Sequence, residues 1–384
     1  MRRCSLSVAL IVAFAGCSSN GGGGTSDASR TTDAHVAIDA ASPVDCAAST
    51  TNLDKVICQA TGFLGTLSAS DAATANPSFS DMAARTKWSN LPGTARAGIK
   101  IGGLSESSQA AGLALMATVL SEAGVSDLTG VRAADDDLAA MGGGGGGMYG
   151  AANYYLAIVG TPSATGNWAI MFGGHHMAYN ITYVAGVGYP TPNHLGVEPK
   201  SAFTIHDETF LPMADESFAI VAAFNSLTTT ELDTAYLDGQ TFSDVLIGPV
   251  EYGTGSSSLA QAKFPTGENR AGVLVSAIAA DKQTLVTTAI QQWVADYDPA
   301  IATALLTAYT SATAYEDTYL AWGGTKSSGV DVEVNGFYMR IDGPRVWIEV
   351  SCQAGVVIQG ATHYHSIYRD KSFDYANTLL RAGR

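Results

Sequence analysis

Apolar residues at a helical spacing recur through the first part of the chain, after a polar N-terminal segment. Between residues 51 and 62 they repeat every three to four positions, with Thr51 or Asn52 as the start and Gly62 near the end. The same spacing predicts a second helix over 107–123. We therefore expect the first part of the folded region to be mainly helical.

The pattern changes to strands near residue 154 and returns to helices near residue 214. Apolar runs over 154–159 and 168–172, and a further segment over 175–184, predict three strands joined by turns. Helical spacing then covers 214–224, 228–237, 281–293 and 298–314. Asp298 followed by Pro299 is typical of a helix start, because Asp caps free N–H groups and Pro fits the first turn.

Short strands separated by tight turns make up the C-terminal part. They are predicted over 330–334, 337–341, 345–352 and 355–365, and Asn335-Gly336 between the first two is a favoured hairpin turn. Consecutive strands with tight turns indicate an antiparallel meander. Because strands and helices come in runs and do not alternate singly, the sequence predicts an α+β fold: an antiparallel sheet meander with packed helices around one mixed core.

The first residues are typical of an export signal. Arg2 and Arg3 precede an apolar run that is too short to span a bilayer, and Ala15-Gly16-Cys17 ends the run. That ending resembles a bacterial lipoprotein box, which implies a signal peptide over residues 1–16 and a lipid on Cys17. The serines that follow Cys17 then imply the outer membrane, and cleavage at an ordinary site, giving a periplasmic or secreted protein, is the alternative.

A segment poor in large apolar residues follows the signal. We interpret residues 17–48 as a flexible tether, because they cannot bury enough surface to offset their ordering entropy. Residues 49–384 are expected to form a single domain. No later stretch has the apolar length of a membrane helix, so contact with a membrane is expected only through the lipid on Cys17.

Composition narrows the classes of function. Hydrophobic residues make up 46% of the chain, charged residues 14%, and the net charge is −15. Such an acidic surface repels phosphates, so we expect no nucleic-acid partner. An oxidising compartment would permit a disulfide between Cys46 and Cys58, whereas Cys352 is interpreted as a buried and inert thiol.

Two short stretches contain four of the seven histidines. His175 and His176 lie in the first, and His363 and His365 in the second. Residues two positions apart on a strand point to one face, so His363 and His365 are expected to project together. With His176 they form a predicted three-histidine metal site, and imidazole ligands favour zinc or copper over magnesium or calcium.

Two reactive roles are assigned beside that ion. Glu198 is the predicted fourth ligand or general base, although Glu349 and Asp370 compete for the same role. Arg369 is the predicted anchor for a carboxylate or phosphate of the substrate, because its guanidinium can bind such groups through two hydrogen bonds.

The remaining polar residues near the histidines are assigned supporting roles. His175, Asn180 and Asp370 are predicted to lie behind the ligands and to orient them. His194 and His206 lie in loop-like sequence between prolines, and each is interpreted as a solvated side chain rather than a further ligand.

Several motifs in this chain occur together in one family. They are Trp88 to Pro92, Gly173 to Asn180, Gly196 to Pro199, Gly343 to Glu349 and His363 to Asp370. On these motifs, which span most of residues 50–384, the chain resembles a bacterial and fungal family of domains of unknown function, family 3500. The resemblance supports the domain limits and the importance of these positions, and it implies no activity.

Three functions are compatible with these residues. The first is an exported, lipid-anchored enzyme that hydrolyses a small-molecule or polymer substrate with the three-histidine ion. The second is a copper-dependent oxidoreductase that uses the same ligands. The third is a non-catalytic surface protein whose histidines and Arg369 bind a ligand without turnover.

Overall fold

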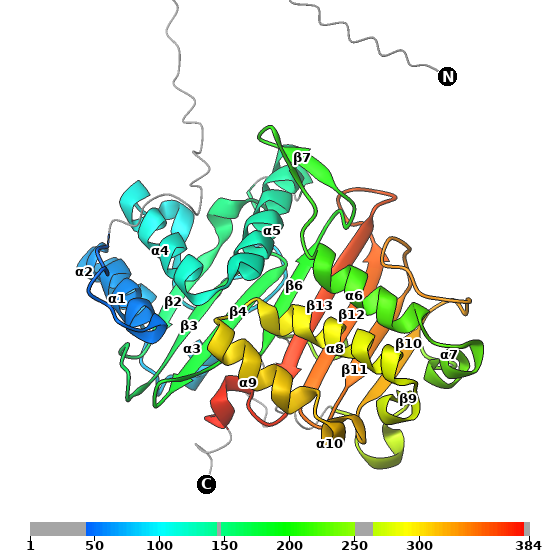
Figure 1. The fold of residues 1–384 in the computed structure, drawn as a ribbon. Helices are drawn as coiled ribbons and strands as arrows, with labels where there is room; N and C mark the ends of the chain where they lie inside the picture. The colour runs from blue at the N-terminus through cyan, green and yellow to red at the C-terminus, as the bar shows by residue number, and fades with distance from the viewer. Residues whose placement is uncertain (1–43, 144–146, 250–263, 380–384) are drawn as a thin grey trace, which may run out of the picture. The chain divides into compact units, whose positions relative to one another are not determined.

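A broad antiparallel sheet forms the frame of the protein, and helices cover one of its faces (Figure 1). The computed structural model describes residues 44–143, 147–249 and 264–379. The α+β class predicted from the sequence is confirmed. The predicted signal peptide, the predicted lipid site at Cys17 and all but the last few residues of the predicted tether lie outside the described residues.

The helices begin at residues that carry recognisable start signals. At α1 (Asn52–Gly65), Thr51 accepts a hydrogen bond from the Asp54 backbone, and the Asp54 carboxylate accepts one from Thr51 in return. At α9 (Pro299–Tyr309), Asp298 caps the first turn as predicted. The other α-helices are α2 (Ala69–Ala75), α3 (Met82–Thr86), α4 (Glu106–Val119), α5 (Glu122–Ala140), α6 (Ala214–Asn225), α7 (Thr229–Ala235), α8 (Ala280–Ala295) and α10 (Ala312–Tyr315).

Two antiparallel meanders meet at one central strand of the sheet. In sheet order the strands are β1 (Ile99–Lys100), β2 (Tyr155–Val159), β3 (Asn167–Gly174), β4 (Met177–Val184), β6 (Asn193–Val197), β13 (Thr362–Asp370), β12 (Val346–Ala354), β11 (Tyr338–Asp342), β10 (Tyr319–Gly323) and β9 (Val273–Leu274). A short strand, β5 (Val187–Tyr189), pairs with β4, and β7 (Phe203–Ile205) forms a separate hairpin with β8 (Glu208–Phe210). Strand β6 joins the meanders because it pairs with β4 on one side and β13 on the other.

Three strand predictions differ from the structure. The strand predicted over 355–365 begins only at Thr362 and continues to Asp370, because residues 355–361 form bends and turns. The segment predicted as one strand over 175–184 begins its strand only at Met177, because His175 and His176 form a two-residue turn between β3 and β4. The strand predicted over 330–334 is wrong: Val330 and Val332 bury their side chains without joining the sheet. The strand that pairs with β11 at this edge is instead β10.

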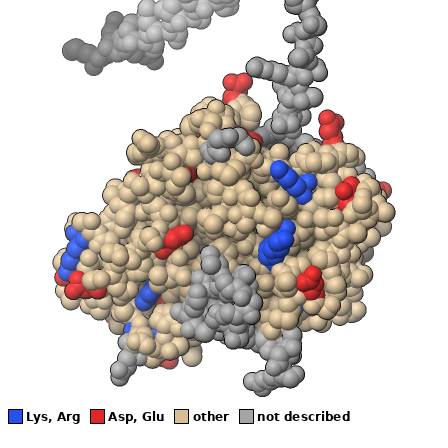
Figure 2. All heavy atoms as spheres, turned by 180° about the vertical axis from the view of Figure 1, so that it is seen from behind, with Lys and Arg blue, Asp and Glu red and all other residues tan. Residues whose placement is uncertain are grey.

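Alternation along β13 separates the two faces of the sheet. Ser366 and Tyr368 point toward the helices, where Ser366 accepts a hydrogen bond from the Trp293 indole in α8 at 2.8 Å. His363 and His365 have the other parity and lie on the face turned away from the helix layer. That face is seen in Figure 2, where acidic and basic side chains of the described residues are scattered among uncharged ones.

The cysteines in the described part of the chain are placed as predicted. Cys46 and Cys58 form a disulfide at the start of the domain, and Cys352 is free and buried in β12. Burial raises the pKa of the Cys352 thiol to about 12, so the thiol is neutral at ordinary pH.

Among the described residues, no helix is both long enough and apolar enough to cross a membrane.

Candidate metal centre

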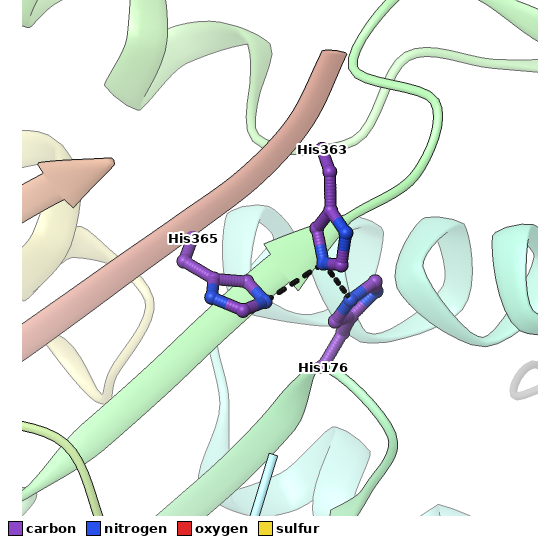
Figure 3. A group of neighbouring side chains, drawn as sticks. All are labelled: His176, His363 and His365. Atoms are coloured by element: carbon purple, nitrogen blue, oxygen red, sulfur yellow. Dashed lines mark hydrogen bonds between the residues drawn. The ribbon is translucent and has the colours of Figure 1, made fainter. Parts of the chain in front are cut away.

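Three imidazoles from distant parts of the chain meet on the sheet face opposite the helices (Figure 3). Nε2 of His363 lies 2.6 Å from Nε2 of His176 and 2.9 Å from Nε2 of His365. The three residues are only 3–6% exposed. The structure therefore brings together the three histidines that the sequence predicted as a group.

The register of three neighbouring strands produces this meeting. Met177 pairs with Leu195 in β6, which puts His176 beside Gly196, and Gly196 pairs in turn with His365 in β13. Because Gly196 has no side chain, the rings of His176 and His365 approach each other across β6, with centroids 5.2 Å apart. The sheet order thus places a turn residue from one meander next to a strand residue from the other.

The turn that carries His176 is fixed by the loop over residues 88–96. The His176 backbone N–H donates to the carbonyl of Asn90 at 3.0 Å. Arg96 donates to the carbonyl of Gly174 at 2.7 Å and to the carbonyl of Ser89 at 2.8 Å. His176 itself has a φ of 63°, a left-handed conformation that is uncommon for a residue with a side chain. These contacts give a structural role to the motif at Trp88 to Pro92.

Carboxylates lie beside the outer nitrogens of two of the rings. Nδ1 of His365 lies 2.7 Å from Oδ1 of Asp244, which accepts its hydrogen. Nδ1 of His363 lies 3.3 Å from Oε2 of Glu198, close enough for attraction although the pair is not aligned as a hydrogen bond. A carboxylate beside Nδ1 keeps the ring proton on that atom and leaves the lone pair of Nε2 free for an ion.

The electrostatic surroundings keep His176 and His363 neutral. Burial, followed by the neighbouring imidazoles, lowers the pKa of His176 well below its ordinary value and that of His363 to about 3. For Asp244, burial alone would raise the pKa, but the hydrogen bond from His365 and nearby charge outweigh it, and the pKa is lowered. The group therefore contains two neutral imidazole donors, His176 and His363, and an ionised carboxylate, and neutral imidazole is the form that binds a metal.

The structure corrects the prediction that His194 is a solvated loop residue. It lies in β6 with 0% exposure, and its ring centroid is 5.0 Å from that of His365. Its Nδ1 lies 3.4 Å from the carbonyl of His176, and its Nε2 is buried with no hydrogen-bond partner among the described residues. Burial lowers its pKa to about 3. The alternation of His194, Gly196 and Glu198 is the sequence signal that could have placed it on this face.

His175 lies next to the three histidines, beside His176 in the turn. Its ring packs against that of His176 with centroids 3.6 Å apart and an angle of 30° between the planes, and its Nδ1 bonds Oδ1 of the buried Asp135 at 2.7 Å. Asp135 was not singled out from the sequence. His206 is exposed in the turn between β7 and β8, in agreement with its interpretation as a solvated side chain.

The structure corrects the predicted role of Glu198 as a fourth ligand or general base. Its carboxylate lies behind His363, on the Nδ1 side, and its Oε1 accepts backbone hydrogen bonds from Val357 at 2.7 Å and Ile358 at 2.6 Å. Its competitor Glu349 is fully occupied elsewhere, since it accepts hydrogen bonds from two aromatic side chains and two backbone N–H groups. Neither carboxylate is in the group of converging ligand atoms.

Arg369, predicted as a substrate anchor, has its contacts elsewhere. Its guanidinium donates to the carbonyls of Ile247 and Gly248 and to the carboxylate of Asp374, all within 3.0 Å. It follows His365 by four positions in β13, or about 13 Å along an extended strand. Arg369 therefore holds the loop before residue 249 onto the sheet.

Two predicted supporting residues also lie away from the histidines. Asp370 points to the helix side, where it accepts a hydrogen bond from Tyr309 at 2.9 Å and pairs with Arg345. Asn180 donates to the carbonyl of Pro192 at 2.9 Å and so fixes the turn before β6. Strand alternation turns Asp370 to the other face of the sheet, whereas Asn180 lies too far along β4 from the site.

The fold and site define a class of protein: an α+β domain with a buried three-histidine group on the sheet face opposite the helices. The chain belongs to the DUF3500 family, described as proteins of unknown function, which matches residues 49–377. No curated protein and no solved structure matches the chain. The resemblance noted in the sequence is thereby confirmed, and the chemistry has to be inferred from the site itself.

Proposed function

We propose that His176, His363 and His365 bind one transition-metal ion, zinc or copper, and that the protein is a metal-dependent hydrolase. The observation that carries this proposal is the convergence of three buried Nε2 atoms. Ligand nitrogens around a tetrahedral zinc ion are about 3.3 Å apart, so an ion fits after the two measured nitrogen pairs, now 2.6 and 2.9 Å apart, separate by roughly 0.7 and 0.4 Å. Neutral imidazoles favour zinc and copper over hard cations.

The surrounding residues fit a catalytic rather than a closed structural ion. Three protein ligands leave a position for water, and a zinc ion in such a site lowers the pKa of its water to about 7. Glu198 and Asp244 hold the protons of His363 and His365 on their outer nitrogens. His194 offers a buried acceptor nitrogen beside His365, suited to receive a hydrogen bond from a water or substrate group.

The metal content of the untagged protein tests the first step. After chelation and reconstitution with zinc or copper, we expect close to one ion per chain, and a strong loss of binding in His363→Ala. The control is His206→Asn, which removes an exposed imidazole and keeps a residue that tolerates the positive φ at this turn. Binding below about 0.1 equivalent in the unaltered protein would overturn the proposal.

Turnover separates hydrolysis from the alternatives. The zinc-loaded protein is expected to hydrolyse at least one compound in a panel of ester, amide, phosphate and glycoside substrates, and His176→Ala to lose that activity. Redox turnover only with copper would support an oxidoreductase instead. Saturable binding of a compound, abolished in His176→Ala but without turnover in any class, would support a binding protein.

We also propose that the chain is exported and carries a lipid on Cys17, with the outer membrane as its location. The Ala15-Gly16-Cys17 ending after a short apolar run supports this proposal. Expression of the full chain with a labelled fatty acid tests it: label and membrane association are expected for the wild type and not for Cys17→Ser. A soluble, unlabelled wild type in the periplasm would favour ordinary cleavage.

A further inference from the structure

A second group of potential ligands lies in the helix layer, on the other side of the sheet from the histidines. Asp127 in α5, Glu216 in α6 and Asp296 at the C-terminal end of α8 each supply a carboxylate oxygen, and these oxygens lie within 4.8 Å of one another. The residues are 6%, 3% and 1% exposed. Three helices thus direct acidic side chains into one buried space.

The hydrogen bonds of this group leave one oxygen unsatisfied. Oδ1 of Asp127 accepts the backbone N–H of Met213 at 2.7 Å. Oδ1 of Asp296 is buried and has no hydrogen-bond partner in the part of the chain that the structure describes. Buried acceptors in native proteins nearly always have a partner, so an orphaned carboxylate oxygen points to a ligand at this place.

The position of Asp296 adds a second electrostatic cost. It caps the C-terminal end of α8, where the helix dipole is negative and disfavours an anion. A cation bound to the carboxylate would remove this cost and would also give the unpaired oxygen a partner.

Charge balance within the group indicates the size of the missing charge. Lys200, which is fully buried, interacts electrostatically with Glu216 and Asp127 and donates to the carbonyl of Pro212 at 3.4 Å. Three ionised carboxylates and one ammonium leave a net charge of −2. One divalent cation neutralises that charge. The competing solution is that the carboxylates hold protons, because burial raises the pKa of Asp127 to about 6 and the pKa values of Glu216 and Asp296 well above their ordinary range.

We propose that Asp127, Glu216 and Asp296 form a second metal site for a hard divalent cation of the class of Ca²⁺, Mg²⁺ or Mn²⁺. Oxygen-only ligands select these ions, whereas the three histidines select zinc or copper. The ion joins α5, α6 and the end of α8, and so fixes the helix layer that packs on the sheet. This inference is independent of the hydrolase proposed above, because it concerns different ligands and a different class of ion.

Binding of each cation to the full-length, chelated and zinc-reloaded protein tests the proposal. Equilibrium dialysis with Ca²⁺, Mg²⁺ and Mn²⁺ is expected to show one saturable site for at least one of them, and that ion to raise the melting temperature. Asp296→Asn should weaken the affinity by roughly tenfold or more and abolish the rise, with zinc content unchanged. The matched control is Asp281→Asn, which removes an exposed carboxylate at the opposite end of α8 and should leave both quantities as in the wild type.

The opposite results overturn the proposal. One is that none of the three cations shows a saturable site with a dissociation constant below about 1 mM. The other is that Asp296→Asn binds the ion as tightly as the wild type. If Asp296→Asn does not fold, Tb³⁺ luminescence of the wild type decides, since Tyr179 and Tyr297 interact with Asp296 and can sensitise a bound ion. Sensitised emission that Ca²⁺ displaces supports the site, and its absence refutes it.

Discussion

Gly196 lies directly opposite His365 in the ladder between β6 and β13, and a Cβ atom at position 196 would lie 2.8 Å from Cδ2 of the His365 ring. The same atom would lie 2.7 Å from the carbonyl oxygen of Tyr364 and 3.4 Å from Cδ2 of His176. The carbonyl belongs to the paired strand and cannot retreat without disturbing the ladder. Position 196 must therefore be glycine for the two rings to share one space.

Gly196→Ala should separate the histidines while the domain still folds. The added methyl group displaces one or both rings, so we expect metal affinity to fall by on the order of tenfold or more and stability by about 1–3 kcal/mol. Titration with zinc and urea unfolding measure the two effects. Gly65→Ala is the control, because a Cβ at the end of α1 has no neighbour within 4 Å among the described residues. Wild-type zinc affinity in Gly196→Ala would contradict this account of the site.

Glu198→Gln should change the ring nitrogen that carries the proton of His363. The amide oxygen of glutamine can keep the hydrogen bonds from Val357 and Ile358, which then leaves its NH₂ group facing Nδ1. A donor there favours the lone pair on Nδ1 and the proton on Nε2, where the ion would bind. We expect zinc affinity to fall about 10–100-fold, measured by competition with a chromophoric chelator.

The control for that experiment is Glu208→Gln, which alters an exposed glutamate on β8 and should bind zinc like the wild type. Both variants are expected to show similar melting temperatures without metal. If Glu198→Gln lowered the melting temperature and left the zinc affinity unchanged, Glu198 would serve only the loop at Val357 and Ile358.

Local sequence signals predicted most of the helices. They also predicted that His363 and His365 share one face of a strand, but not how His176 comes to meet them. The cap at Asp298 and the period-two spacing of His363 and His365 depend on neighbours in the chain, and both are confirmed. His176 was predicted to lie on a strand, but it lies in a two-residue turn. In sequence, such a turn looks like the start of the strand that follows it. The meeting of His176 with His365 depends on the pairing of β6 with both meanders, which no local pattern encodes.

The carboxylates around the site show the same limit. Asp135 and Asp244 contact His175 and His365 across 40 and 121 positions of sequence, and neither stands in a recognisable motif. Glu198 stands out in the sequence, but only the fold shows that it reaches Nδ1 of His363 rather than the ion side of the ring. Residue type thus predicted which histidines meet, whereas the roles of the supporting groups required long-range contacts.

Arg369→Lys should affect stability and leave metal binding unchanged. The buried guanidinium bonds Asp374 and the carbonyls of Ile247 and Gly248, and an ammonium group cannot replace this fork of donors. We expect the free energy of unfolding to fall by about 2–4 kcal/mol, since a buried carboxylate loses part of its partner. Urea unfolding and zinc titration are the measurements. Normal stability combined with lost substrate turnover would instead restore the catalytic role predicted from the sequence.

Cys352 should make the stability of the protein decrease at alkaline pH. Burial raises the pKa of its thiol to about 12, whereas a cysteine in the unfolded chain has a pKa of about 8.5. Because the folded pKa is the higher one, this contribution is fully present below pH 8.5 or so and is lost as the pH rises toward the folded value. Relative to Cys352→Ser, the wild type should lose up to about 1.4 kcal/mol per pH unit above that point. Urea unfolding at pH 7, 9 and 10 measures the difference, in which the lysines and tyrosines common to both proteins cancel; parallel pH profiles would show that the thiol is accessible to solvent in the folded state.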